Sequence, residues 1–74
     1  MNYQTYTVST MHKNHVYNLM NQLVQEEKSL WRIKSDYMKD AKGFKDCLDF
    51  WKKMQKDKEA HIKELTALIQ KHLN

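Results

Sequence analysis

Apolar residues recur every three or four positions along two stretches of the chain, and this spacing predicts two long helices. The first stretch extends from about residue 10 to 41 and the second from about 44 to 72. Gly43 is the only glycine, lies between the two stretches, and is the residue type that most often ends a helix in the left-handed conformation. We therefore predict an all-α fold in which a turn at 42–43 joins two helices.

Helices joined by so short a turn must lie side by side in opposite directions, as a long antiparallel hairpin. A single hairpin cannot enclose a core, because each apolar stripe has a partner on one side only. We expect a homodimer that forms a four-helix bundle, or a helical partner subunit that covers the same surface. The residues expected in the core or the interface are Leu19, Leu23, Leu30, Trp31, Tyr37, Phe44, Leu48, Trp51, Met54, Leu65 and Leu68.

Charged residues interrupt both apolar stripes at about half their length. Glu26 and Glu27 interrupt the first stripe, and Asp57 and Lys58 interrupt the second. Counting outward from the turn places Glu27 opposite Lys58, with His61 about one helical turn further along the same face. We therefore predict a central polar layer of Glu26, Glu27, Lys58 and His61. Such a layer can fix helix register and partner choice, although desolvation offsets much of its attraction.

This arrangement resembles half of a ferritin-like or rubrerythrin-like bundle, in which a Glu on the first helix of a hairpin faces Glu-x-x-His on the second. Glu27 matches the first-helix ligand and His61 matches the histidine. The resemblance implies iron, or another divalent metal, bound across a dimer and stored or oxidised there. Lys58 stands where the second carboxylate is expected, and a lysine donates hydrogen bonds only and repels a cation.

A smaller metal site is the alternative to a purely structural layer. Asp57 and His61 are four residues apart on one helical face, and Glu26 or Glu27 could add a third ligand. Because this spacing is common by accident, we favour a salt-bridged layer without a cofactor. His12 and His15 are expected near His72 at the open end of the hairpin, either in solvent or as a divalent-metal clip.

The net charge of +4 comes from basic and acidic residues that are interleaved along the chain, a pattern typical of solvated helix faces. The densest basic face carries Lys52, Lys56 and Lys63, but Glu59 lies within it. A weakly nucleic-acid-associated protein is therefore a third interpretation, without a recognisable readout element to support it. Cys47 is the only cysteine, lies on the apolar stripe, and is expected to be half-buried and reduced.

Residues 1–9 carry β-forming and polar residues without a helical period, and we interpret them as an extended or disordered arm. No apolar run approaches the about 20 residues that span a membrane, and the reduced thiol fits a cytoplasmic protein. No nucleophile–base motif or phosphate loop is recognisable. The sequence therefore favours a non-enzymatic, self-associating structural or protein–protein interaction module, with the metal protein as the first alternative.

Overall fold

The computed structural model describes residues 14–73, and over this range the chain is helical on both sides of one turn. Helix α2 covers Asn14–Arg32, the π-helix η1 covers Ile33–Tyr37, and α3 covers Met38–Asp40. These three segments follow one another without a break, and α4 then covers Lys45–Leu73. The all-helical fold class is thus confirmed. The predicted arm at 1–9 and the predicted helix start at residue 10 lie outside the described residues.

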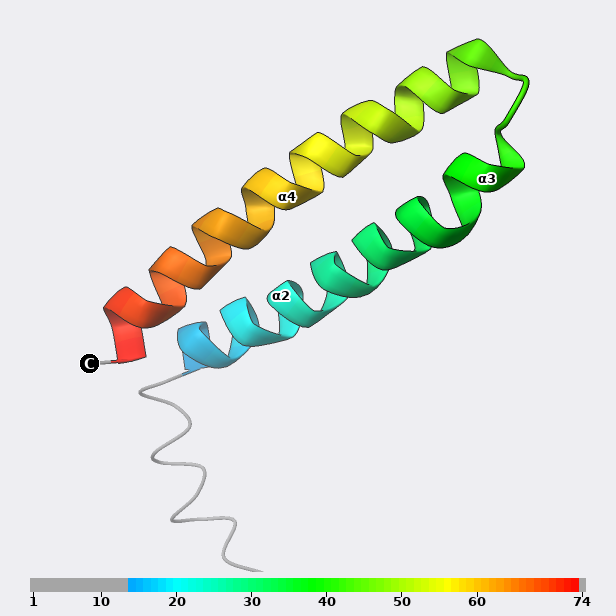
Figure 1. Cartoon of the computed structure of the whole chain (residues 1–74). Coiled ribbons are helices and arrows are strands. Elements are labelled where there is room, and N and C mark those ends of the chain that lie inside the picture. The colour runs from blue at the N-terminus through cyan, green and yellow to red at the C-terminus, as the bar shows by residue number, and fades with distance from the viewer. Residues whose placement is uncertain (1–13, 74) are drawn as a thin grey trace, which may run out of the picture.

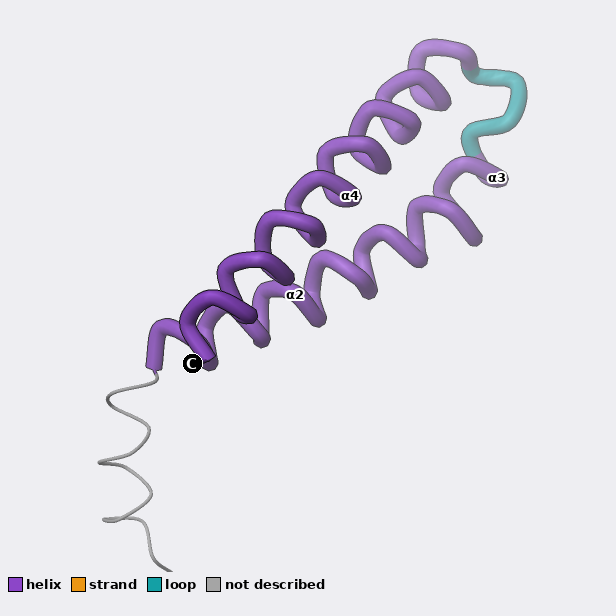
Figure 2. The backbone as a smooth tube through the Cα atoms, turned by 60° about the vertical axis from the view of Figure 1, so that its left-hand side comes forward, coloured by secondary structure: helices purple, strands orange, loops and turns teal. Residues whose placement is uncertain are grey.

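The chain folds back on itself after α3, and α4 lies alongside α2 for most of its length (Figures 1 and 2). The turn is closed by the backbone N–H of Phe44, which donates to the carbonyl of Ala41 at 2.9 Å. Gly43 has a φ of 92°, in the left-handed region that residues with a side chain rarely adopt. It is the third of four turn residues, where type II turns require a positive φ. The turn therefore forms around the glycine that the sequence indicates.

The side chains between the two helices follow a strict three–four spacing, which is the heptad pattern of a two-stranded coiled coil. We call this contact the seam. The seam positions on α2 are Val16, Leu19, Leu23, Glu26 and Leu30, and those on α4 are Leu48, Trp51, Gln55, Lys58, Ile62, Leu65 and Ile69. Ser29 on α2 and the predicted core residue Met54 on α4 lie next to these positions and are half-buried as well. Among the described residues, the buried apolar ones are few, namely Val16, Ile33, Ala41 and Ile69. The hairpin therefore has a very small core of its own.

The π-helix η1 shifts the helix phase by one residue between α2 and α3. The N–H of Met38 donates to the carbonyl of Ile33, five residues earlier. In an α-helix the acceptor is four residues earlier, so the π-helix holds one extra residue. As a result Met38 and Ala41 follow Ile33 on the seam. The sequence predicted an uninterrupted helix with Tyr37 on the apolar stripe, and this was wrong in detail. Tyr37 lies at the edge of the seam, where its ring packs on Trp51 with centroids 4.8 Å apart.

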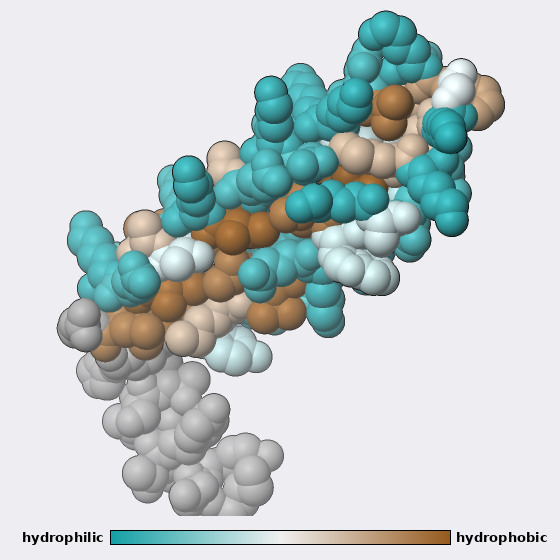
Figure 3. Space-filling view, viewed as in Figure 1, coloured by the Kyte–Doolittle hydropathy of each residue, from teal (hydrophilic) through white to brown (hydrophobic). Residues whose placement is uncertain are grey.

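Several residues predicted for the core or interface are exposed in the hairpin. Trp31 and Phe44 are 66% and 63% exposed, and Tyr37 and Leu68 are just over one-third exposed. Cys47, expected to be half-buried, is exposed as well. One seam accommodates a single row of side chains from each helix, so the neighbouring apolar row stays outside. Figure 3 shows hydrophobic side chains in a band along the line where the helices meet and out onto the surface.

Replacing Gly43 with alanine should lower the free energy of unfolding by about 1 kcal/mol, because an L side chain is strained at this φ. A Cβ at this position would meet nothing within 4 Å, so the cost is one of backbone conformation alone. Gly43→Asn should cost less, since Asn tolerates the left-handed region better. Urea unfolding at one fixed protein concentration measures all three chains. Equal stabilities would contradict the conformation described here.

Deleting Ser35 should change the free energy of unfolding by no more than about 1 kcal/mol, since it converts η1 into ordinary α-helix and leaves Ile33 and Met38 on one face. Deleting Gln25, an exposed residue in regular α-helix, is the matched control. It rotates the preceding part of α2 by about 100° and takes Val16, Leu19 and Leu23 off the seam. A loss on the order of 3 kcal/mol or more follows for the control. Similar losses for the two deletions would contradict the assigned phase shift.

Candidate functional site

Glu26 is the one charged residue that is buried among the described residues, with 6% of its surface exposed. It lies about two-thirds of the way along α2, between Leu23 and Leu30, at a seam position where the three–four spacing would otherwise place an apolar side chain. A carboxylate removed from water must be paired and hydrogen-bonded to remain charged. The site is therefore defined by what surrounds the two oxygens of Glu26.

Side chains from both helices form hydrogen bonds with those two oxygens. Lys58 Nζ donates to Oε2 at 3.0 Å, and His61 Nδ1 lies 2.7 Å from Oε1. Gln22, one turn earlier on α2, donates its Nε2 hydrogen to Oε2 at 3.1 Å. No buried side-chain nitrogen or oxygen of the described residues lacks a hydrogen-bond partner. We call Glu26, Lys58 and His61 the Glu26 layer; its charges are satisfied within one hairpin.

The environment of Glu26 acts on its pKa in two opposing directions. Burial alone would raise the pKa, because it penalises the charged form. The hydrogen bonds and charges of His61 and Lys58 favour the charged form. Together they outweigh the effect of burial, and the pKa of Glu26 is lowered from 4.5. The ionised carboxylate therefore stabilises the folded hairpin at neutral pH. This contribution is complete above about pH 4.5 and is lost as the pH falls through the lowered pKa of the folded state.

Glu27, which the sequence analysis paired with Lys58, is exposed and lies outside the layer. The π-helix explains the error, because one extra residue between the turn and mid-helix brings Glu26 rather than Glu27 to the depth of Lys58. The seam spacing itself carried the correct signal. Leu19, Leu23, Glu26 and Leu30 are separated by four, three and four residues. This spacing places position 26, rather than 27, on the same helix face as the leucines.

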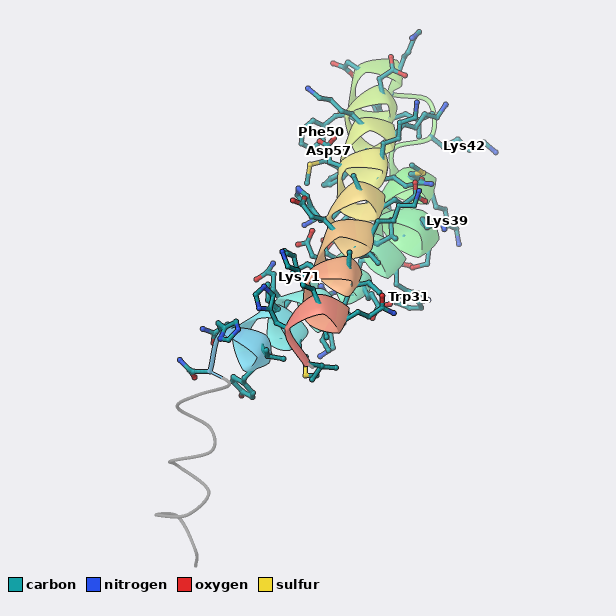
Figure 4. All side chains as sticks on the ribbon, turned by 90° about the vertical axis from the view of Figure 1, so that its left-hand side faces the viewer. Trp31, Lys39, Lys42, Phe50, Asp57 and Lys71 are labelled. Atoms are coloured by element: carbon teal, nitrogen blue, oxygen red, sulfur yellow. The ribbon has the colours of Figure 1, made fainter. Side chains whose placement is uncertain are left out.

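The residues predicted as metal ligands do not come together. Glu27 and Asp57 are both exposed, and His61 faces Glu26 beside the ammonium of Lys58. Figure 4 shows Asp57 on the same side of α4 as Phe50, opposite the side of Trp31. Over residues 14–73, no three His, Cys, Asp or Glu side chains stand close enough to share a metal ion. The geometry is that of an ion-paired layer.

His15 and His72 meet at the open end of the hairpin, where the sequence analysis placed them. Their rings contact edge to face with centroids 5.0 Å apart, and both residues are exposed. His12, the third member of the predicted group, lies outside the described residues. The contact joins the ends of α2 and α4.

A second feature is a row of exposed apolar side chains on α2. Tyr17, Met20, Val24 and Trp31 are 60%, 40%, 46% and 66% exposed. They repeat the three–four spacing of the seam one residue later, with Glu27 at the position between Val24 and Trp31. We call these four residues the α2 stripe. It flanks the seam on one side, and all four of its side chains stay exposed in the described hairpin.

A groove of about 770 Å³ runs beside the stripe, between the C-terminal end of α2 and the middle of α4. Its apolar lining comes from Leu30, Trp31, Ala60 and Ile62. The α4 rim of the groove is charged and carries Lys56, Glu59 and Lys63. Two of the three lysines of the predicted basic face thus lie along this groove with an acidic residue between them.

Comparisons with protein-family models, with curated proteins and with solved structures found no match. Among the described helices, none is long and apolar enough to cross a membrane. The features of the described residues that bear on function are the Glu26 layer, the α2 stripe and the groove.

The Glu26 layer predicts a specific pH dependence of stability. In the unmodified chain the free energy of unfolding should fall as the pH is lowered below about 4.5, and Glu26→Gln should remove part of that fall. At pH 7 the same variant should be less stable by about 1–3 kcal/mol, because Lys58 loses its charged partner. Urea unfolding between pH 3 and 7 measures both effects.

Glu27→Gln is the matched control, since it changes the neighbouring exposed carboxylate. It should keep the pH dependence of the unmodified chain. If the two variants have the same pH profile, Glu26 does not carry the linkage assigned to it.

Proposed function

We propose that the chain is a non-enzymatic, self-associating helical module. In this proposal the antiparallel hairpin pairs with a second copy along the α2 stripe, and the two hairpins form a four-helix bundle. The bundle acts as a structural or protein–protein interaction element. The observation that carries the proposal is the α2 stripe itself, a heptad-spaced row of large apolar side chains left in solvent.

The small core of the hairpin supports association. Ile33 is the largest fully buried side chain among the described residues, and most of the seam is only half-buried. A domain of this size seldom has enough apolar burial to be stable alone, and oligomerisation is a common remedy. Contiguous apolar surface on a small protein is also a typical mark of an interaction site. A second layer of helices would supply the missing burial.

The composition of the stripe side favours a second copy as the partner. On this side α4 contributes the charged residues Lys56, Glu59 and Lys63 beside Ala60 and Ile62, whereas the large exposed apolar side chains belong to α2. A twofold contact brings the same patch of each copy together, and apolar area then meets apolar area. The charged α4 rims lie at the edge of such an interface, where polar groups are usual.

The Glu26 layer has a structural part in this proposal. Its hydrogen bonds join α2 to α4 across the seam and are satisfied without a second chain. A displacement of α4 by one turn would separate the carboxylate from Lys58 and His61 and leave the charges unpaired. We therefore propose that the layer fixes the register of α4 against α2. This register keeps the stripe and the groove on the same side of the hairpin.

The chain should have a mass of about twice 9.0 kDa by light scattering at micromolar concentrations and should dissociate on dilution. Val24→Asp puts a charge in the middle of the stripe and should shift the equilibrium at least about tenfold toward the monomer. Gln25→Asp adds the same charge at the next residue, off the stripe, and should leave the mass unchanged. A folded species of 9.0 kDa at every concentration would overturn the proposal.

A further inference from the structure

We infer that the two copies meet with Val24 on the twofold axis, and that Tyr17 of each copy enters the groove beside Trp31 of the other. This inference rests on the proposed self-association and specifies its register. It makes the α2 stripe and the groove the two halves of one self-complementary surface.

The spacing of the stripe leads to this register. Tyr17 and Trp31 each lie seven residues from Val24, which is about 10.5 Å along the helix in either direction. When two α2 helices cross in opposite directions at Val24, Tyr17 of one copy therefore lies opposite Trp31 of the other. A shift by one helical turn either way moves one of these two aromatic residues past the end of the partner's stripe. The register centred on Val24 pairs both.

The groove provides space where Tyr17 would arrive. It is lined by Trp31 and Leu30 on α2 and by Ile62 on α4, so an aromatic ring meets apolar surface inside it. The rim residues Lys56, Glu59 and Lys63 offer polar partners to a tyrosine hydroxyl, which usually finds one when its ring is buried. Tyr17 is 60% exposed in the hairpin, so its ring is free to make this contact.

The charged interruption of the stripe fits the same register. Glu27 of one copy faces position 21 of the other when Val24 lies on the axis. Position 21 is Asn21, an exposed residue whose amide N–H can donate to a carboxylate. The two Glu27 carboxylates are kept apart, each facing an amide.

Cysteine cross-linking tests the register, in a Cys47→Ser chain so that the native thiol takes no part. Val24→Cys should give a disulfide-linked dimer under mild oxidation, because a residue on the axis meets its own copy within disulfide range. A mixture of Met20→Cys and Lys28→Cys chains should give the mixed disulfide in at least about tenfold excess over either homodimer, since these two positions face each other in this register. Gln25→Cys, off the stripe, is the matched control and should stay monomeric on a denaturing gel.

The outcomes separate this inference from the proposed self-association. A mass of twice 9.0 kDa by light scattering together with no Val24→Cys or mixed disulfide would overturn the register and leave the dimer standing. A mass of 9.0 kDa would overturn both. A second readout is Trp31 fluorescence in a Trp51→Phe chain. Its emission should move to shorter wavelength as the protein dimerises, and an emission that stays at the position of an exposed indole in the dimer would overturn the inference.

Discussion

A pair of helices has one seam, and each helix can bury one row of side chains in it. Everything else in this chain follows from that limit. Along α2, the row from Val16 to Ile33 occupies the seam, and the next row, from Tyr17 to Trp31, is left in solvent. The exposed row has the same spacing and nearly the same apolar character as the buried one. The hairpin supplies a neighbour for the first row, and we propose that a second copy supplies one for the other.

The polar residues make that single seam specific. Apolar side chains alone would allow α4 to slide along α2 by one turn with little change in burial, because the heptad repeats. We propose that Glu26 removes this freedom, since Lys58 and His61 satisfy its carboxylate at one position. The π-helix η1 and Gly43 place the turn so that this pairing is reached. Register, turn and stripe are thus parts of one arrangement.

The sequence predicts much of this arrangement, and the misses have physical causes. The three–four spacing and Gly43 predict two helices and their turn, and the charged interruption predicts that Lys58 and His61 lie near a glutamate. The choice of Glu27 over Glu26 depended on counting from the turn, and a one-residue shift defeats such counting. The shift arises at η1, where the Ser35 hydroxyl donates to the carbonyl of Trp31 at 2.7 Å. Serine does this in ordinary helices as well, so the sequence gives no distinct signal for it.

The exposure of Trp31 could not be predicted from residue type, because both rows of α2 are apolar and only the seam decides which is covered.

Isotope-filtered NMR on a mixture of labelled and unlabelled chains tests the central claim, that a second copy covers the exposed row, most directly. We predict intermolecular contacts between the Val24 methyl groups of the two copies and between the rings of Tyr17 and Trp31. Contacts within one chain alone, with the tumbling time of a 9.0 kDa protein, would contradict the claim.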